Sequence, residues 1–479
     1  MDHRAMYIDG RWQDFPDLDR IEVENPADER VIATIPEADA VIARQALSAA
    51  KAAQQTWAAR PAIERARAVR ALAALVEQSA ETFAVSLVAE QGKPISQARG
   101  EVAGAVTFLT HAAESARRIE GDIMPSDNPD EEIMIRRLPR GVVVGLTAWN
   151  YPLALAARKL GPALVAGNTF VLLSHEITPL AGLNLAALAD QAGLPAGVFN
   201  VITGRGASAG RALVESPLSD LVTMTGSTRA GREIFRSAAD RLKVLSLELG
   251  GKAPFIVMED ADLDHAVDAA VAARFANCGQ VCTCNERMYL HRDIADEFMR
   301  RFVARTRALR IGDPMGDPDL GPKVSRVEID KIENLVEAAI AKGAEPILRG
   351  GRLTGGEYAK GHWIAPTVLE VADNTNPIMQ SELFGPVVPF LRVDGFEDAV
   401  AKANDSEYGL SAYLFTRDIG RMMRVSRKLN FAEIYFNRSN GEQVQAYHSG
   451  WNQSGIGGED GKYGFDNYLK KQTMYVNWS

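Results

Sequence analysis

The chain has 479 residues and a mass of 52.0 kDa, so a typical domain size predicts roughly three domains' worth of material. Hydrophobic residues make up 46% and charged residues 24%, which excludes a disordered protein. The net charge of -9 argues against nucleic acid and against an anionic membrane surface as partners.

Three cysteines, Cys278, Cys282 and Cys284, lie within seven residues, and the rest of the chain has none. Disulfide frameworks need cysteines spread along the chain, so that class is excluded. A zinc site needs a fourth ligand, but the nearest histidine, His291, begins a charged segment, and we expect no metal.

No targeting or membrane segment is visible in the sequence. The first ten residues, MDHRAMYIDG, lack the apolar core of a signal peptide, and the best apolar stretch, 152–173, is interrupted by Arg158 and Lys159. We therefore expect a soluble, cytoplasmic protein in a reducing compartment, where thiols stay free.

The pattern of the N-terminal part predicts short strands followed by helices. MYIDGRW and a loop at 25–27 are followed by an alanine-rich helical region that reaches about residue 118, with a break at 91–94. Pro61 suits the start of one helix. The apolar residues then recur at helical spacing and predict one buried face: Ile63, Ala66, Val69, Leu72 and Val76.

Residues 119–140 contain two strand-like runs separated by polar turns, which predicts a hairpin standing off the main body. Two interpretations are open for this hairpin: a surface excursion, or an arm for self-association.

Residues 141–249 alternate between strands and helices. One helix is expected to start at Thr178-Pro179, with Thr178 as its cap. The alternation predicts a parallel sheet, and such sheets bind ligands at the carboxyl ends of their strands. The expected strands are GVVVGLT, NTFVLL, VFNVITG, DLVTMTG and VLSLELGG.

A second alternating series begins after Gly250-Gly251 and runs to about residue 437. Its expected strands are PFIVM, PILR, VVPFLRV, SAYLFT and EIYFN, and its expected helices lie near 295–309, 325–342, 395–403 and 418–427. The tail from Trp451 is rich in glycine and aromatic residues and ends in a strand-like QTMYVNW.

Three residues are candidates for catalytic roles: a nucleophile, a general base and a donor to an oxyanion. Cys282 follows a glycine turn and is a potential nucleophile, although a lone cysteine is more often a packing residue. Glu248 ends an apolar strand, where desolvation favours a general base. Asn150 follows the first strand of the sheet and offers an amide donor to an oxyanion.

The segment 226–231, GSTRAG, follows a strand and begins a helix. Free backbone N–H groups at a helix start can hold a phosphate, although this segment lacks the G-x-G-x-x-G pattern.

Together these segments resemble the aldehyde dehydrogenase superfamily over essentially the whole chain, and most closely its bacterial lactaldehyde/glycolaldehyde dehydrogenases. The resemblance rests on the segments WNYP (149–152), GPALVAGNT (161–169), TGSTRAG (225–231), LELGGKAP (247–254), GQVC (279–282) and ELFGPV (382–387). The narrower group is indicated by GRG (204–206), CGQVCTCNERMYL and YHSGWNQSGIGGEDGKYGFDNYL.

The resemblance implies an α/β fold in three parts. These are a parallel-sheet dinucleotide-binding domain (1–118 and 141–249), an α/β catalytic domain (250–450) and a small β arm for oligomerisation (119–140 and 451–479), in a homodimer or homotetramer.

The resemblance also implies a mechanism. Cys282 attacks the aldehyde, Asn150 and the Cys282 N–H hold the oxyanion, a hydride leaves for the nicotinamide, and Glu248 activates water to release the acid from the thioester. Lys159 matches a lysine near the catalytic pocket. The implied substrate residues are Arg158, Glu442 and His448, and the implied cofactor residues are Trp149, Glu176, Gly206, Gly226, Ser227, Gly231, Leu249, Glu382 and Phe384.

The chain departs from the family where the adenine ribose binds. The family has Lys-Pro-Ser-Glu, whereas this chain reads Leu173-Ser174-His175-Glu176. The retained Glu176 favours NAD over NADP, because a carboxylate repels the 2′-phosphate, while a protonated His175 would weaken that repulsion.

The expected function is NAD-dependent oxidation of a short polar aldehyde, such as lactaldehyde or glycolaldehyde, to its acid. Three alternatives are open: another anionic aldehyde or semialdehyde as substrate, transfer of the thioester to coenzyme A, or a non-catalytic family member with impaired cofactor binding. Glu248 disfavours transfer to coenzyme A, because members of that kind tend to lack the water-activating glutamate.

Overall fold

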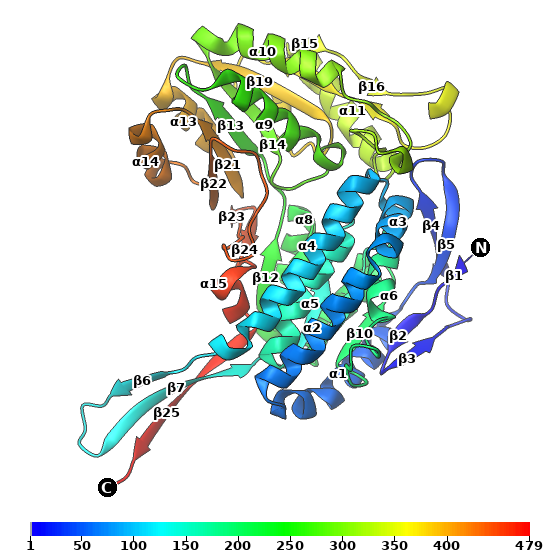
Figure 1. Ribbon diagram of the computed structural model, residues 1–479, viewed down its shortest axis with the longest axis vertical. Helices are drawn as coiled ribbons and strands as arrows, with labels where there is room; N and C mark the ends of the chain where they lie inside the picture. Colours follow the sequence, from blue (N-terminus) through cyan, green and yellow to red (C-terminus); the bar gives the residue numbers. More distant parts are fainter. Residues whose placement is uncertain (1) are drawn as a thin grey trace.

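The computed structural model describes residues 2–479, and its first large element is a sheet of eight strands in the order β24-β12-β11-β8-β9-β10-β2-β3 (Figure 1). The five strands predicted for 141–249 form its parallel centre, which confirms that prediction. They are β8 (Val142–Leu146), β9 (Thr169–Leu173), β10 (Phe199–Ile202), β11 (Leu221–Thr225) and β12 (Val244–Glu248). The edge strands β24 (Gly455–Ile456), β2 (Met6–Ile8) and β3 (Arg11–Gln13) run antiparallel to their neighbours.

Helices cover both faces of this sheet, because its central strands are apolar on both sides. Val143, Phe170 and Leu172 pack under α2, α4, α5 and α6, whereas Val142 and Val171 pack under α1 and α7. The helices are α1 (Ala40–Ala59), α2 (Ala62–Gln78), α3 (Ala80–Gln91), α4 (Ile95–Glu114), α5 (Pro152–Ala166), α6 (Leu180–Ala186), α7 (Arg211–Glu215) and α8 (Thr228–Ala238). No single helix within residues 2–479 is long and apolar enough to cross a membrane; α2 and α3 pass that test only as a pair, bent by 73°.

The start of α6 differs from the prediction. Thr178 does not cap the helix, and its buried hydroxyl has no hydrogen-bond partner within residues 2–479. Instead, the carboxylate of Glu90 in α3 accepts the N–H groups of Leu180 and Ala181 at 2.7 and 2.9 Å. A residue ninety positions away therefore satisfies the first turn, which local sequence cannot reveal.

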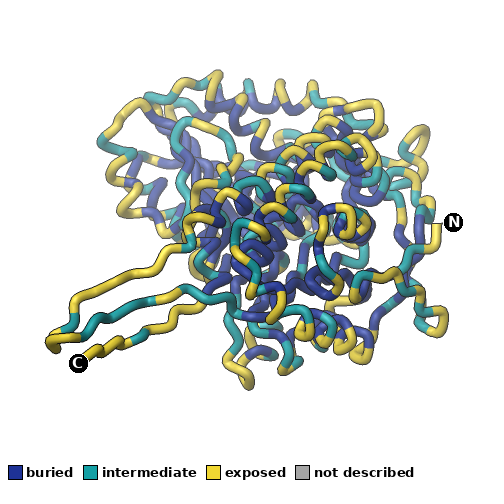
Figure 2. Tube along the Cα trace, turned by 60° about the horizontal axis from the view of Figure 1, so that its bottom comes forward, coloured by how far each residue is buried: buried dark blue, intermediate teal, exposed yellow. Residues whose placement is uncertain are grey.

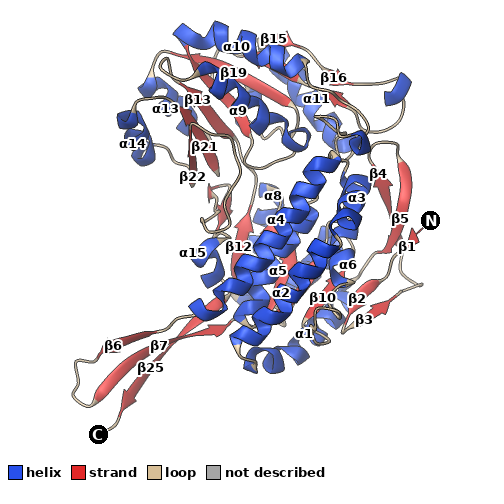
Figure 3. Ribbon diagram, viewed as in Figure 1, coloured by secondary structure: helices blue, strands red, loops and turns tan. Residues whose placement is uncertain are grey.

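A second sheet of seven strands stands above the first, in the order β15-β18-β19-β14-β13-β21-β22, and is parallel except at β15 (Figure 3). The five strands predicted for this half are present, whereas β14, β18 and α12 were not predicted. The strands are β13 (Ala253–Val257), β14 (Asn285–His291), β15 (Glu345–Leu348), β18 (Thr367–Glu370), β19 (Val387–Val393), β21 (Ser411–Phe415) and β22 (Glu433–Phe436). The helices are α9 (Leu263–Phe275), α10 (Arg292–Arg307), α11 (Arg326–Ala341), α12 (Pro377–Gln380), α13 (Phe396–Asn404) and α14 (Ile419–Lys428).

The predicted hairpin projects from the body as an arm, whose outer part is largely exposed (Figure 2). Its strands β6 (Asp122–Pro125) and β7 (Glu131–Pro139) are joined by β25 (Leu469–Asn477), which pairs with β7 over nine residue pairs. Only this last part of 451–479 lies in the arm. The preceding residues return to the body as β23 (Trp451–Asn452), β24 and α15 (Gly461–Asp466).

Three smaller pairings complete the fold. The strands β1 (Asp2–His3), β5 (Arg30–Pro36) and β4 (Arg20–Asn25) form a three-stranded sheet. Two-stranded sheets join β16 (Gly351–Arg352) to β17 (Ile364–Ala365), and β20 (Tyr408–Gly409) to β23.

The centre of the first sheet provides a test of packing at one glycine. A Cβ on Gly145 of β8 would overlap the ring of Phe170 on β9, so we expect Gly145→Ala to destabilise the fold by about 1–3 kcal/mol. Gly104→Ala, in α4 with open space around it, is the matched control and is expected to stabilise by about 0.5–1 kcal/mol. Denaturant unfolding of both variants checks this, and shifts of the same sign and size would contradict it.

Candidate active site

The residues predicted from the first sheet meet at one edge. Each parallel strand ends at this edge and is followed by predicted residues: Trp149 and Asn150 after β8, Glu176 after β9, Gly206 after β10, Gly226 and Ser227 after β11, and Glu248 and Leu249 at the end of β12. The carboxyl edge of the sheet is where a parallel α/β fold binds ligands.

Cys282 lies on a turn that follows an unusual stretch of backbone. Asn277, Cys278 and Gly279 have consecutive positive φ values of 48°, 55° and 74°. Two of these residues are not glycines, so the backbone here is strained, and such strain is often found at functional sites. A Cβ on Gly279 would overlap the carbonyl of Gly385, so glycine is needed to bring the two segments together.

Cys282, Glu248 and His448 form a cluster in which the Sγ, a carboxylate oxygen and a ring nitrogen all lie within 4.8 Å of one another. His448 Nε2 is 3.1 Å from Glu248 Oε1. The other oxygen of Glu248, Oε2, is buried and has no partner among the described residues. Burial raises the pKa of the Cys282 thiol to about 12, and the contact with His448 works in the opposite direction.

Asn150 is held on two sides. Its backbone carbonyl accepts from Lys93 Nζ at 2.8 Å and from Asn277 Nδ2 at 3.0 Å, and its own Nδ2 donates to the carbonyl of Gln280 at 3.0 Å. Lys93 also pairs with buried Glu101, which accepts the first N–H groups of α5. The amide is therefore fixed against the turn that carries Cys282.

Arg158 and Lys159 are both buried, and both are already paired with carboxylates. The Arg158 guanidinium donates to Asp460 through Nε at 2.9 Å and also through Nη2, and it lies 3.5 Å from Glu459. Lys159 Nζ donates to Glu459 and, at 2.8 Å, to Thr225 Oγ1. The predicted substrate cation Arg158 is thus neutralised within the protein.

Glu382 and Phe384 lie beside the loop after β12. The N–H of Gly251 donates to Glu382 Oε1 at 2.8 Å, and burial together with the nearby Glu286 raises the pKa of Glu382 to about 7. The Phe384 ring packs edge-on against Trp149, with centroids 5.2 Å apart. Lys323 Nζ lies 5.5 Å from the Trp149 ring centroid and donates to the Phe384 carbonyl at 2.5 Å.

Glu286 of β14 links these segments and was not predicted. Its buried carboxylate pairs with Lys252 at 2.8 Å and with Arg274 at 3.3 Å, and it accepts the N–H groups of Leu383 and Phe384. Burial opposes its charge, but Lys252 and Arg274 outweigh burial and lower the pKa of Glu286 to about 2.

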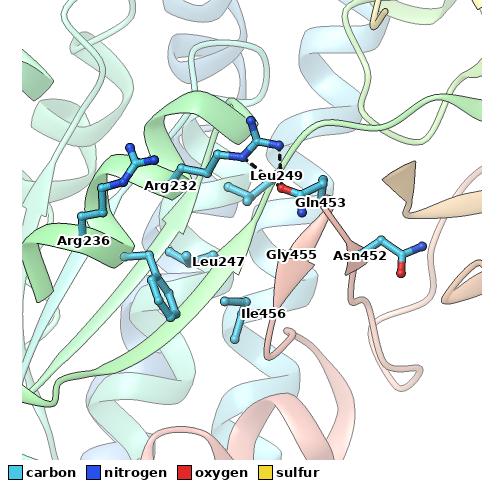
Figure 4. Close-up of a pocket in the computed structure, with 10 residues that line it drawn as sticks. Arg232, Arg236, Leu247, Leu249, Asn452, Gln453, Gly455 and Ile456 are labelled. Carbon is cyan, nitrogen blue, oxygen red and sulfur yellow. Dashed lines mark hydrogen bonds between the residues drawn. The ribbon is translucent and has the colours of Figure 1, made fainter. Parts of the chain in front are cut away.

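A hollow of about 260 Å³ lies beside α8 (Figure 4). The predicted cofactor residues Gly231 and Leu249 line it, and Arg232 crosses it to donate to Gln453 at 2.7 and 2.9 Å. Leu247 and Leu249 face this hollow, whereas Glu248 between them points to the Cys282 cluster, because side chains alternate along a strand.

The donor set at this edge fits a nicotinamide dinucleotide. Ser227 caps α8, and the N–H groups of the first helical turn suit a pyrophosphate. Glu382 offers a carboxylate to ribose hydroxyls, and the Trp149–Phe384 pair offers flat apolar surface to a ring.

At the far end of the edge, Glu176 lies beside His175, with 3.5 Å between Oε2 and Nδ1. Burial lowers the pKa of His175, so its ring is uncharged at neutral pH and does not offset the charge of Glu176.

The sequence did not single out several residues at this site: Lys93, Glu286, Lys323, Glu433, Glu459 and Asp460. A charge in an otherwise apolar strand was the available signal for Glu433, whereas Glu286 lies between Asn285 and Arg287 and gave no such signal. For Glu459 and Asp460 the signal was an acidic pair within a glycine-rich run.

The fold and this site define the class of protein. The chain belongs to the aldehyde dehydrogenase family, whose family model, "Aldehyde dehydrogenase family", matches residues 12–474. It is therefore an NAD(P)-dependent enzyme that oxidises aldehydes, as predicted.

Among curated proteins, the chain is 48% identical over 480 residues to the 3,6-anhydro-alpha-L-galactose dehydrogenase of Vibrio sp. (strain EJY3), covering 100% of both chains. It is 42% identical to the lactaldehyde dehydrogenase of Escherichia coli (strain K12), covering 98% of both. Among solved structures, 3,6-anhydro-L-galactose dehydrogenase in complex with NADP matches with a TM-score of 0.97 and 48% identity, over 99% of this chain and 100% of that one.

A substitution at Gly251 tests whether the loop after β12 must lie close to Cys282. A Cβ at Gly251 would lie 2.5 Å from the Cys282 carbonyl oxygen. We expect Gly251→Ala to displace Cys282 and to lower kcat for aldehyde oxidation about 10- to 100-fold. Gly312→Ala, at an open position, is the control. An unchanged kcat in Gly251→Ala would show that the turn carrying Cys282 tolerates the displacement.

Proposed function

We propose that this enzyme oxidises a short, uncharged aldehyde with a hydroxyl next to the aldehyde carbon, through a thioester on Cys282. The observation that carries the proposal is the cluster of Cys282, Glu248 and His448. The neighbouring cations, Arg158 and Lys159, are already paired with carboxylates of the protein.

Each catalytic group has a distinct task. The Cys282 thiolate attacks the aldehyde carbon, and the Asn150 amide together with the Cys282 N–H donates to the oxyanion. The Cys282 N–H makes no hydrogen bond within the described residues, so it is available for this purpose. Glu248 then removes a proton from water, which attacks the thioester and releases the acid.

The cofactor residues hold a nicotinamide dinucleotide, which supplies the hydride acceptor when bound. Ser227 and the first turn of α8 serve the pyrophosphate, with Gly226 and Gly231 allowing its close approach. Glu382 serves a ribose, Trp149 and Phe384 line the nicotinamide, and Leu249, Gly206 and Glu176 complete the groove.

The preference for an uncharged substrate follows from the electrostatics. Arg158 and Lys159 are paired with Asp460 and Glu459, so neither is free to meet a substrate carboxylate. Glu442, 4.0 Å from His448, adds another acidic group. Carboxylates therefore outnumber cations, which disfavours semialdehyde acids, whereas Glu442 and His448 suit a hydroxyl. The lactaldehyde and 3,6-anhydrogalactose named for the relatives both carry a hydroxyl beside the aldehyde.

We also propose that the arm joins subunits into a homodimer or homotetramer. Its strands leave the body, and Tyr475 and Trp478 on them are 69% and 59% exposed, which is unusual for side chains of that size.

An aldehyde screen tests the substrate proposal. We expect kcat/KM for glycolaldehyde, lactaldehyde or 3,6-anhydro-L-galactose to exceed that for propanal about tenfold or more, because a site that pairs with a hydroxyl rejects its absence. Succinate semialdehyde is expected to be a poor substrate. Cys282→Ala is the control and is expected to abolish every activity. Equal rates on propanal would contradict the hydroxyl site, and a preference for the semialdehyde would contradict the uncharged substrate.

Calorimetric titration tests the cofactor. We expect NAD to bind more tightly than NADP, because Glu176 faces the position of the 2′-phosphate without a charged His175 beside it. Glu176→Gln is expected to raise NADP affinity several-fold with little change for NAD. If the unmodified enzyme binds NADP more tightly than NAD, then Glu176 does not select the cofactor.

A further inference from the structure

His448 lies between the nucleophile and the base. Its ring is 2% exposed, its Nε2 is 3.1 Å from Glu248 Oε1, and a ring nitrogen lies within 4.8 Å of Cys282 Sγ. The backbone of His448 is fixed by a pair of hydrogen bonds with Glu459, at 2.9 and 2.7 Å. The imidazole thus lies beside both groups that change protonation during the reaction.

The opposite nitrogen is held by a carboxylate that no part of the proposed mechanism uses. Nδ1 of His448 is 2.7 Å from Glu433 Oε1. The second oxygen of Glu433 accepts from the Tyr435 hydroxyl at 2.7 Å. Tyr435 stacks on Tyr413, whose hydroxyl donates to the carbonyl of Thr283, the residue after Cys282. Glu433 is therefore fixed in place and braced against the nucleophile turn.

The surrounding charges favour a protonated ring. Burial and the neighbouring Arg158 oppose the charge, but Glu248 and Glu433 outweigh them, so the pKa of His448 is raised well above its usual value. Glu442 lies 4.0 Å from Nδ1 and adds to this effect. Glu459 and Asp460 also lie nearby, but they are engaged with Arg158 and Lys159.

We propose that His448, clamped between the carboxylates of Glu248 and Glu433, stabilises the Cys282 thiolate and holds the Glu248 carboxylate in place, with Glu433 as its positioning residue. This inference rests on the proposed function, in which Cys282 is the nucleophile and Glu248 the base. It gives His448 a task beyond contacting the substrate and gives Glu433 the task of keeping His448 charged.

The chemistry balances without a further reagent. The S–H bond of Cys282 breaks, its proton leaves to solvent, and the positive charge of the neighbouring imidazolium stabilises the resulting thiolate. Both ring protons stay in place throughout, so His448 acts as a fixed charge and not as a base. A half-buried thiol beside a carboxylate needs such a cation, since desolvation and Glu248 both favour the neutral thiol.

The rate of alkylation by iodoacetamide reports the thiolate fraction of Cys282 without any aldehyde. We would measure it on the intact enzyme between pH 5.5 and 9.5 by mass spectrometry, with Cys282→Ser to identify the modified site. We expect His448→Gln to slow alkylation about tenfold or more at each pH in this range, because the thiolate loses the neighbouring positive charge.

Glu433→Gln gives a second signature that depends on pH. Without its carboxylate, His448 loses its proton at a lower pH. Alkylation is then expected to match the unmodified enzyme within about twofold at pH 6 and to fall about fivefold behind it by pH 8. Should His448→Gln fail to fold, this variant alone decides the question.

His362→Gln is the matched control, because His362 is a buried histidine that pairs with Glu24 at 2.7 Å outside this cluster. It is expected to leave the profile unchanged. The proposal is overturned if His448→Gln keeps the original profile while only KM rises, which would make His448 a substrate residue, or if Glu433→Gln matches the unmodified enzyme at every pH. A third outcome is also informative: the enzyme oxidises no aldehyde, but its alkylation rate still depends on His448. That outcome would reject the proposed function and support the role of His448 in stabilising the thiolate.

Discussion

The buried carboxylate of Glu286 holds the catalytic centre together. Lys252 reaches it from the loop after Glu248, Arg274 from the helix before Cys282, and the N–H groups of Leu383 and Phe384 from the segment beside Glu382. Arg274 also donates to the carbonyls of Gly279 and Gly385. Taking one partner away from such a buried pair typically costs about 3–5 kcal/mol, so the base, the nucleophile and the cofactor segment are positioned by one shared interaction.

This arrangement explains how the strained turn before Cys282 persists. Left-handed backbone at Asn277 and Cys278 is unfavourable by itself. It is retained because Asn277 donates to the Asn150 carbonyl and accepts the N–H of Gln280, while Arg274 ties Gly279 to Gly385. The contacts that stabilise this strained backbone also connect the turn of Cys282 to Asn150, whose amide is proposed to hold the oxyanion.

The sequence predicted the elements whose pattern is local. Apolar strands followed by glycines and polar residues predicted the first sheet and its ligand-binding edge, because each strand carries its own signal. The strand β14 was missed since Asn285, Glu286 and Arg287 look like a polar loop. They are buried, and their charges are satisfied by residues from other elements.

Side-chain partners were less predictable than positions. Arg158 was predicted as a substrate residue, and nothing in the sequence indicates its partner in the fold, Asp460, which lies 302 residues later. Glu433 and His448 come from separate stretches of the second half, and only the folded chain shows that they meet beside Glu248. Sequence patterns identify the residue types suited to a chemistry, whereas the pairing of charges depends on the tertiary structure.

The position of β24 affects how the protein is made. This strand completes the first sheet beside β12, yet its residues follow β12 by about 200 positions along the chain. At about 5–20 residues per second, a ribosome makes β24 some ~10–40 s after β12. During that interval the edge of the sheet next to Glu248 is unpaired, and such edges attract other strands. The nascent chain therefore passes through a stage in which an unpaired strand edge borders its future active site.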